Sequence, residues 1–312
     1  MAIITPPQEI DLSYYRKIHP EFIHCPDEAL IEHCKTFAIP QGYSTCSCDR
    51  REQLQPMLQK EIDTRHLKAL EISPWFNPFL SGDNVKYFST MDYEEAKKAA
   101  ISNKLSTERI PHEMHFVSPT GDLGIVNETF DIIFSSHVIE HTPNLVKHLN
   151  DVEKLLNKGG LYVLMIPDKR YCFDHYRPES TILDVMDAFF NERNTARFVD
   201  KFFSIEKSHN NAISHWLGYH SELFKNDDPE FDKKNPHRKE GYRFALISTF
   251  KKYKKDVEAG TYIDTHNWRF TPDSFRYIVN ILNDMKFINL PLYRLYHTLW
   301  GRLEFIVMFE KI

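Results

Sequence analysis

One short segment of the sequence gathers residue types that could do chemistry, the string Ser-Ser-His-Val-Ile-Glu-His at 135–141. Within it, His137, Glu140 and His141 match the HxxEH pattern of inverted zinc peptidases, which places zinc-binding histidines on one face of a helix. Here the string follows a run typical of a buried strand and leads into Pro143, so it predicts a strand end and a loop. We therefore exclude the peptidase interpretation.

The sequence pattern on both sides of this string predicts an α/β fold. From Leu67 onward, short apolar runs alternate with stretches of helical periodicity, a pattern typical of βαβ units around a parallel sheet. Thr142 and Pro143 predict the start of a helix, Gly159-Gly160 its end, and Thr271-Pro272 the start of a later helix. The predicted strands are 67–72, 84–88, 114–117, 130–136 and 161–167, with a closing antiparallel pair at 287–296 and 303–309.

The organisation of the chain predicts three parts. Residues 1–65 are expected to form an N-terminal accessory arm, and residues 66–170 and 262–312 the α/β core. Residues 171–261 are aromatic, polar and charged, and predict a mainly helical insertion that acts as a lid. Within it we predict one mobile turn-rich loop, Lys225 to Gly241, and interpret His209, His215, Trp216 and His220 as packing residues.

Composition narrows the classes of function. The 312 residues are 42% hydrophobic and 27% charged, as in globular proteins, and the net charge of -5 gives no general attraction to nucleic acid. No apolar run approaches the roughly 20 residues of a membrane span, and the N-terminus lacks a signal-like pattern, so we expect a cytoplasmic protein. The five cysteines are expected to be thiols. Four of them, Cys25, Cys34, Cys46 and Cys48, are too irregularly spaced to favour a zinc knuckle.

The segment FDIIFSSHVIEHTPNLVKHLNDVEKLLNKGGLYVLMIP, residues 130–167, resembles the block of strand four, helix and strand five in class I S-adenosylmethionine (SAM) dependent methyltransferases. The later HNWRFTPDSF resembles the C-terminal part of the same family, in particular of members encoded among bacterial surface-polysaccharide biosynthesis genes. The resemblance implies a Rossmann-like, seven-stranded, mostly parallel sheet with a reversed last strand. It also implies SAM as the cofactor, bound across the first four strand ends.

The resemblance assigns cofactor contacts to the loops after the first four strands. Where family members carry glycines, or acidic residues for the ribose and the adenine, this chain has Ser73, Ser89 and Ser118, with Asp92 and Asp122 close by as substitutes. The expected cofactor-binding residues are Glu71, Ser73, Pro74, Ser89, Asp92, Ser118, Ser135, Ser136 and His137.

The same resemblance points to the catalytic residues. A histidine with a pKa near 6.5 can take the proton of an acceptor hydroxyl, so His141 is the first candidate base, His266 the second, and Glu140 an orienting group. Small-RNA 2'-O-methyltransferases of this fold hold a divalent ion with a Glu-His pair and a later histidine, which Glu140, His141 and His266 match. Such a donor set suits Mn²⁺, Fe²⁺ or Zn²⁺ better than Ca²⁺. The ion in question is Mn²⁺ or Mg²⁺; the favoured alternative is that Glu140 and His141 hydrogen-bond the substrate or support the loop without a metal. Arg170 and Tyr171 are expected to contact the acceptor.

Taken together, these features predict a SAM-dependent O-methyltransferase that acts on a sugar or polysaccharide precursor. The alternative is a protein of this fold that no longer binds SAM, acting as a binding or scaffold partner or as a metal-assisted enzyme of other chemistry, which the serines at 73, 89 and 118 favour. The sequence predicts neither the identity of the acceptor nor the oligomeric state.

Overall fold

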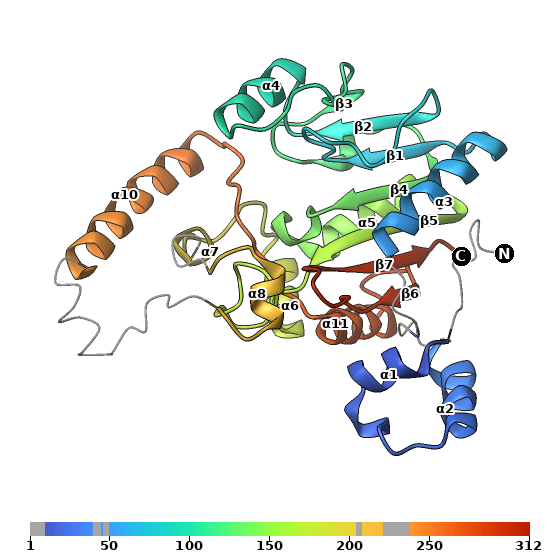
Figure 1. Cartoon of the computed structure of the whole chain (residues 1–312). Helices are drawn as coiled ribbons and strands as arrows, with labels where there is room; N and C mark the ends of the chain where they lie inside the picture. The colour runs from blue at the N-terminus through green and yellow to red at the C-terminus, as the bar shows by residue number, and fades with distance from the viewer. Residues whose placement is uncertain (1–9, 40–44, 46–49, 204–207, 221–237) are drawn as a thin grey trace.

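A computed structural model describes residues 10–39, 45, 50–203, 208–220 and 238–312 (Figure 1). The described residues contain a seven-stranded sheet with the order β3-β2-β1-β4-β5-β7-β6, in which β7 is antiparallel to both of its neighbours and all other pairs are parallel. This arrangement confirms the predicted sheet, including the reversed strand. The strands are β1 Ala69–Ile72, β2 Val85–Ser89, β3 Phe116–Val117, β4 Phe130–Ser136, β5 Leu156–Pro167, β6 Leu292–Tyr296 and β7 Glu304–Glu310.

Helices cover both faces of the sheet because β1, β4 and β5 are apolar on both sides. On one face, α5 (Leu145–Leu155), α6 (Ile182–Phe190) and α11 (Pro272–Asp284) contribute to the largest hydrophobic cluster. On the other face, α3 (Arg50–Arg65) places Leu54, Leu58 and Ile62 against β1, β4, β5 and β7. A smaller cluster packs α4 (Tyr93–Ser102) against residues of the surrounding loops, among them Phe76, Ile110 and Met114.

The connection between β1 and β2 departs from the predicted βαβ pattern. Residues 73–84 form an irregular loop with no helix, although β1 and β2 are adjacent and parallel. Pro74 and Pro78 disfavour helical backbone in this stretch, because proline cannot donate a hydrogen bond and restricts the residue before it. The general βαβ pattern therefore does not extend to this strand pair.

Several predicted boundaries also shift. The helix after β4 is capped by Asn144, whose side chain accepts the Lys147 N–H at 3.0 Å, and not by Thr142. It ends at Leu155 instead of at the glycine pair, which lies in a bulge of β5 where a side chain at Gly160 would meet the carbonyl of Asn157. Thr271 caps α11 as predicted.

The closing strand predicted at 287–296 forms only from Leu292. The side chain of Asn283 holds the backbone of Leu290 by two hydrogen bonds of 3.1 Å, and Pro291 has no N–H to donate, so the preceding residues cannot join the sheet. The short connection near Gly301 to β7 agrees with the prediction of an antiparallel pair at the edge.

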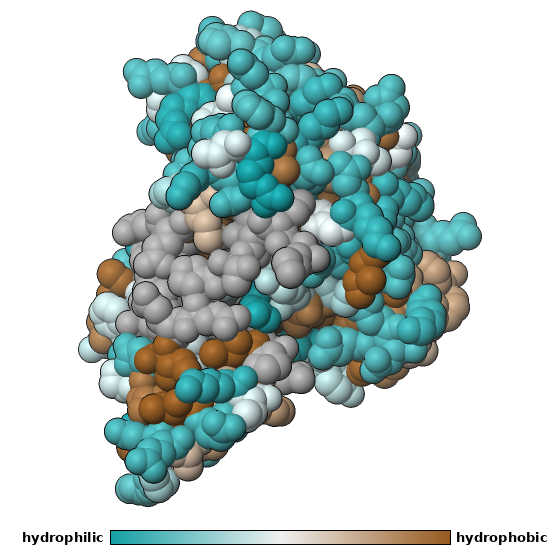
Figure 2. Space-filling view, turned by 90° about the vertical axis from the view of Figure 1, so that its right-hand side faces the viewer, coloured by the Kyte–Doolittle hydropathy of each residue, from teal (hydrophilic) through white to brown (hydrophobic). Residues whose placement is uncertain are grey.

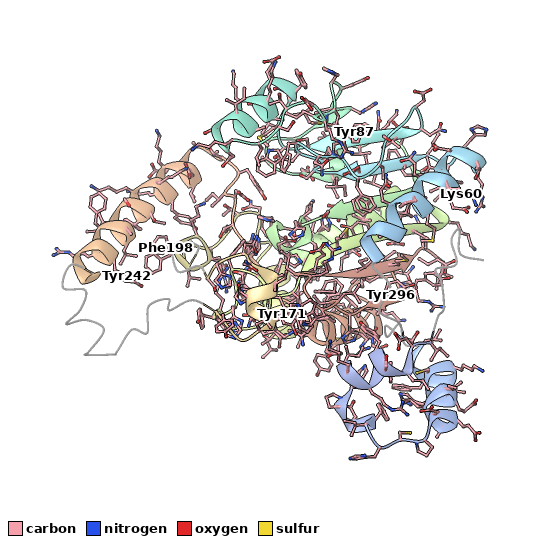
Figure 3. The ribbon with its side chains drawn as sticks, in the orientation of Figure 1. Lys60, Tyr87, Tyr171, Phe198, Tyr242 and Tyr296 are labelled. Atoms are coloured by element: carbon pink, nitrogen blue, oxygen red, sulfur yellow. The ribbon has the colours of Figure 1, made fainter. Side chains whose placement is uncertain are left out.

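Within residues 171–261 the structure describes α6, α7 (Phe198–Phe203), α8 (Ala212–Trp216) and the long α10 (Arg238–Glu258), joined by non-helical stretches. The ring of Phe198 contacts Phe250 and Tyr253 of α10, and Figure 3 shows Phe198 and Tyr242 on these neighbouring helices. Most of the loop predicted at Lys225 to Gly241 lies outside the described residues, and its last four residues belong to α10.

The N-terminal segment forms a small helical unit with its own core. It comprises α1 (Leu12–Ile18), the 3-10 turn Pro20–Phe22, α2 (Asp27–His33) and a π-helical turn Cys34–Ala38. Cys25, Cys34 and Cys172 are free thiols, as predicted, whereas Cys46 and Cys48 lie outside the described residues. Among the described helices, none combines the length and the apolar composition that a membrane crossing requires. Outside the grey atoms, the surface shown in Figure 2 is mostly hydrophilic, with hydrophobic side chains in small groups.

Candidate active site

A cavity of about 590 Å³ opens at the carboxyl ends of the central strands. Ile72 of β1, Phe88 of β2 and Val138 after β4 form apolar parts of its wall. Residues 193–196, 257, 260 and 261 of the insertion also line it, together with the adjoining Tyr262 and Ile263. Its size is typical of a small-molecule site, and its place beyond the strand ends is where open α/β sheets bind ligands. The insertion thus closes a cavity of the size that a nucleotide-like cofactor needs.

Three polar residues of the cavity wall come from the loops after β1, β2 and β3: Ser73, Thr90 and Asp122. Ser73 has a φ of 57°, a left-handed conformation in which glycine is the usual residue. Asp122 caps the 3-10 turn Leu123–Ile125 and lies 3.1 Å from Lys147 Nζ. The Gly124 N–H and then the Lys147 ammonium lower the pKa of Asp122, so this carboxylate is charged and available to a ligand's amine or hydroxyls.

Of the nine predicted cofactor contacts, Ser73 is the one found in the cavity wall. Glu71 is buried and accepts N–H groups of Phe79 and Leu80 at 2.8 to 3.0 Å, so its carboxylate holds the loop 73–84. Burial raises the pKa of Glu71 to about 7, although these amides favour the charged form. Pro74 follows Ser73, and its carbonyl accepts the Asn77 N–H.

The predicted contacts after β2 and β3 are engaged with local backbone. Ser89 Oγ accepts the Met91 N–H at 3.0 Å, and Ser118 Oγ accepts the Asp122 N–H at 3.0 Å. Asp92 caps α4 by accepting the Glu95 N–H at 2.8 Å, with Glu95 completing a capping box. These side chains shape the loops whose neighbours, Thr90 and Asp122, face the cavity.

The predicted contacts after β4 have different surroundings. Ser135 is buried and lies 2.9 Å from the Tyr162 hydroxyl, which also lies 2.9 Å from His148 Nε2. Burial lowers the pKa of His148 to about 4, so this ring is neutral. Ser136, the last residue of β4, is partly exposed, and His137 follows it with a φ of 54°.

Glu140 occupies the centre of the polar site beside the cavity. It lies in the 3-10 turn Ile139–His141, is only 1% exposed, and neither carboxylate oxygen has a hydrogen-bond partner in the described part of the chain. Three imidazole nitrogens approach its Oε1: His137 Nδ1 at 3.7 Å, His141 Nε2 at 3.8 Å and His266 Nε2 at 3.8 Å. A buried carboxylate without hydrogen-bond partners destabilises the fold, so this arrangement is typical of a site that binds a ligand or an ion.

Backbone hydrogen bonds place His266 opposite Glu140. The carbonyl of Glu140 accepts the N–H groups of Asn267 and Trp268 at 2.7 and 3.1 Å. The side chains of the same two residues donate to the carbonyls of His141 and Thr142 at 2.9 and 2.7 Å. Four bonds therefore fix the HNW segment against the turn after β4.

Carboxylates behind two of the imidazoles orient the rings. His266 Nδ1 lies 2.5 Å from Asp174 Oδ2, and His141 Nδ1 lies 2.8 Å from Asp264 Oδ1, so both Nε2 atoms point toward Glu140. Burial disfavours the charged ring of His141, but Asp264 and Glu140 outweigh it and raise its pKa above the ordinary value. The paired His141 and His266 hold the pKa of Asp264 and Asp174 below the usual range, although burial opposes the shift at Asp174.

The donor atoms of Glu140, His141 and His266 all lie within 4.8 Å of one another. Two ligands of one transition-metal ion, each bound at about 2.1 Å, are separated by at most about 4.2 Å, so the 3.8 Å distances fit a shared ion. The carboxylate without partners and the supported imidazoles fit such an ion chemically as well. The structure therefore brings together the three residues that the sequence grouped, with His137 beside them.

The two predicted acceptor residues lie on the loop that follows β5. Arg170 is paired with the buried Asp168 through Nε at 2.9 Å and Nη2 at 2.6 Å, and Asp168 also accepts the Thr298 hydroxyl. The Tyr171 ring, labelled in Figure 3, stacks on Trp216 of α8 with centroids 3.9 Å apart. Arg170 is thus held by core residues and Tyr171 by α8, and a contact of either residue with the acceptor stays a prediction.

Sequence reasoning missed a buried ionic network under the insertion. Asp200 accepts hydrogen bonds from Arg177 at 3.2 Å, Arg197 at 2.7 Å and Arg269 at 2.9 Å, and Arg177 also holds Asp174. In the sequence these residues belong to charged stretches that look like a solvated surface. The one available signal was Arg269, which follows the HNW segment directly.

Residues 79–164 match a family described as a methyltransferase domain. The match covers β2 to β5 and includes the turn that carries Glu140. The fold is that of the class I methyltransferases. The match also supports SAM as the cofactor, in agreement with the sequence resemblance.

Known structures show low-level likeness to this chain, and no curated protein sequence matches it. A SAM-dependent methyltransferase from Clostridium acetobutylicum has 9% identity over 92% of this chain and 99% of its own, with a TM-score of 0.35. The CalH methyltransferase in complex with S-adenosylhomocysteine (SAH) has 12% identity over 83% of this chain and 55% of its own, at 0.36. The chain covers 36% of the DszA carbon methyltransferase, with 16% identity over 38% of this chain and a TM-score of 0.27.

Proposed function

We propose that this protein transfers a methyl group from SAM to an oxygen of a sugar or polysaccharide precursor. The observation that carries the proposal is the buried Glu140, whose two oxygens have no hydrogen-bond partner among the described residues while three imidazole nitrogens lie 3.7 to 3.8 Å away. Hydroxyl groups can satisfy such a set, since a hydroxyl both donates to a carboxylate and accepts from an imidazole. The choice of a sugar derives from the sequence resemblance.

The cavity residues suit the methyl donor. Ile72, Phe88 and Leu123 offer apolar surface for an adenine ring, and Thr90 and Asp122 offer polar atoms for the ribose and the base. Bound SAM supplies a methyl group attached to a positively charged sulfur. The insertion covers the cavity with residues 193–196, 257, 260 and 261, which excludes water from the reacting groups.

His141 is the best-placed proton acceptor. It lines the cavity, its Nδ1 faces Asp264, and its Nε2 points toward Glu140. Asp264 raises the pKa of His141 and stabilises the protonated ring, so Nε2 can take the proton of an acceptor hydroxyl. Glu140 accepts a hydrogen bond from the same acceptor and orients it, while Asp174 holds His266 on the opposite side.

A second candidate arrangement uses a divalent ion. Glu140, His141 and His266 would hold Mn²⁺ or Mg²⁺, which would polarise the acceptor hydroxyl and lower its pKa. In that case His141 is a ligand, and added metal is required for turnover.

The alternative function, a protein of this fold that no longer binds SAM, is disfavoured by two observations. A cavity of about 590 Å³ is retained at the strand ends, and the polar loop residues Ser89, Asp92 and Ser118 maintain the loops around it. The loss of acidic residues at these positions is therefore compatible with a working cofactor site.

Calorimetric titration with SAM and SAH, with and without Mn²⁺ or Mg²⁺, is the first test. We expect micromolar binding, followed by transfer of a labelled methyl group to oxygen within a panel of sugars and nucleotide sugars. Turnover that stops on chelation and returns with Mn²⁺ would select the metal arrangement. No binding of either ligand would refute the proposed activity, and methylation at carbon or nitrogen would refute the proposed acceptor.

A further inference from the structure

Four histidines gather at the junction of the insertion and the core, apart from the site around Glu140. His175 lies on the loop after β5, His215 lies on α8, and His209 and His220 flank that helix. The rings of His175 and His220 stack with centroids 3.8 Å apart, and the His209 and His215 centroids are 4.3 Å apart. The cluster joins segments that are about 40 residues apart in the sequence.

Hydrogen bonds fix which nitrogen of two of these rings is free. His215 Nε2 lies 2.9 Å from the carbonyl of His209, and His175 Nδ1 lies 2.8 Å from the carbonyl of Arg170. A carbonyl oxygen only accepts, so both of these nitrogens carry the proton of a neutral ring. The lone pairs are then on His215 Nδ1 and His175 Nε2. A ring nitrogen that donates to a backbone carbonyl is the usual support of a metal-binding histidine.

The His215 nitrogen that keeps its lone pair lies within hydrogen-bond distance of His220, so a bound ion would replace this hydrogen bond. His215 Nδ1 lies 2.9 Å from His220 Nδ1, and the donor atoms of His175, His215 and His220 all lie within 4.8 Å of one another. Two imidazole nitrogens bound at about 2.0 to 2.1 Å to a tetrahedral zinc ion lie about 3.3 Å apart, so small ring movements would complete the geometry.

His209 differs from the other three although it is packed beside them. Its Nε2 lies 3.0 Å from the carbonyl of Tyr219, and its Nδ1 accepts the Asn211 N–H at 3.2 Å. Both of its nitrogens are therefore occupied by backbone groups. This residue provides a matched control within the cluster.

We propose that His175, His215 and His220 form a Zn²⁺ site that fixes the insertion to the loop after β5. Three neutral imidazoles suit Zn²⁺ in a tetrahedral geometry, with the fourth position open to water. The Tyr171–Trp216 stack and the hydrogen bond of 2.9 Å from Trp216 Nε1 to the Arg302 carbonyl already hold α8 in place, so the backbone that carries His215 is fixed before an ion binds. This proposal does not depend on methyl transfer.

The position of this zinc site has a consequence for the site around Glu140. His175 follows directly after Asp174, the residue that holds His266 at 2.5 Å. Zinc bound to His175 would restrain the short loop that carries Asp174. The metal would thus stabilise the orientation of His266 from outside the cavity.

The test is Zn²⁺ binding by the full chain without a histidine tag. To isolate the new site, the measurements use a chain with Glu140→Gln and His141→Ala, stripped with a chelator. We expect one Zn²⁺ per chain in competition with a chromophoric chelator, and Co²⁺ to give the visible spectrum of tetrahedral nitrogen ligation. His175→Gln, His215→Gln and His220→Gln should each weaken Zn²⁺ binding by at least about 100-fold, since even supporting residues of metal sites cost 10- to 100-fold. His209→Gln should retain it.

Three results would overturn the zinc site. One is Zn²⁺ binding that is equally strong in the three substituted chains and in the chain that keeps all three histidines. A second is a Co²⁺ spectrum with intense sulfur-to-metal absorption, which would assign the ion to cysteines. The third is the absence of bound Zn²⁺. The spectrum of the chain with the histidines intact decides the matter even if a substituted chain fails to fold. Absence of any bound Zn²⁺ would identify the cluster as a purely hydrogen-bonded one.

Discussion

Strand β1 and the turn after β4 each carry a buried glutamate, and the two carboxylates are used in opposite ways. Glu71 is 3% exposed and accepts backbone N–H groups from Phe79 and Leu80, whereas Glu140 is 1% exposed and accepts none from the described residues. Burial and charge alone do not distinguish the two glutamates. Their hydrogen-bond partners do: the Glu71 carboxylate binds backbone of its own chain, whereas the Glu140 oxygens remain open to a ligand.

The largest effect expected from this contrast is on turnover. His141→Ala should lower kcat by about 100-fold or more, because general-base catalysis contributes about 10²- to 10⁴-fold. The affinity for SAM should stay within a few fold, as measured by calorimetry alongside the kinetics. His24→Ala, an exposed position in the N-terminal arm, is the control. Unchanged turnover would remove His141 from the mechanism.

The second effect concerns the pH dependence of stability at Glu71. Its folded-state pKa of about 7 lies above its ordinary value of 4.5, so the folded state binds this proton more tightly than the unfolded state. The stabilisation is complete below pH 4.5 and is lost as the pH rises through 7, a change of about 3 kcal/mol. Urea unfolding of the natural chain and of Glu71→Gln between pH 4.5 and 8 should show their difference in unfolding free energy changing by this amount. A constant difference would contradict the assignment.

The contrast also predicts how the stability of the protein changes when Glu140 is replaced. Replacing this carboxylate by an apolar side chain of similar size, in Glu140→Met, should stabilise the metal-free protein by about 1 to 3 kcal/mol, because an unsatisfied buried group is removed. The same substitution should abolish activity. Thermal unfolding in the presence of a chelator measures the change. Strong destabilisation would show that Glu140 is structural in the way that Glu71 is.

The smallest expected effect is on SAM affinity, and it tests which of two carboxylates contacts the cofactor. The sequence assigns Asp92 to the cofactor, whereas the structure places Asp92 at the helix cap and Asp122 in the cavity wall. Asp122→Asn should weaken SAM binding about 10-fold, as expected for one lost hydrogen bond to a charged group. Asparagine also caps helices well, so Asp92→Asn should have little effect on binding. A larger loss in Asp92→Asn would favour the sequence-based assignment.

Much of the sheet could be predicted because its signals are local. The runs 130–136 and 161–167 are apolar enough to identify buried strands, and Thr271-Pro272 begins a helix as capping preferences require. The missing helix between β1 and β2 was less visible, since the loop is held by Glu71, whose role depends on amides eight and nine residues away.

The candidate site was predicted only in part, because sequence patterns reveal neighbours along the chain and not pairs that are far apart in it. Glu140 and His141 are adjacent and follow a strand, so their grouping needed no tertiary information. His266 joined them through a family resemblance, and its partner Asp174 is 92 residues away. The ionic network around Asp200 depends on pairings of the same long range, which no local pattern encodes.

The helix-free connection of residues 73–84 also bears on how the chain folds. β1 pairs with β2 across only about 16 residues, as in Ala69 with Val85, but with β4 across 63, as in Ala69 with Ile132. The entropy lost in closing a loop grows with its length, so the β1–β2 pair closes the shortest loop of any parallel pair involving β1. We expect it to form early and to act as the edge on which β4 and β5 then assemble.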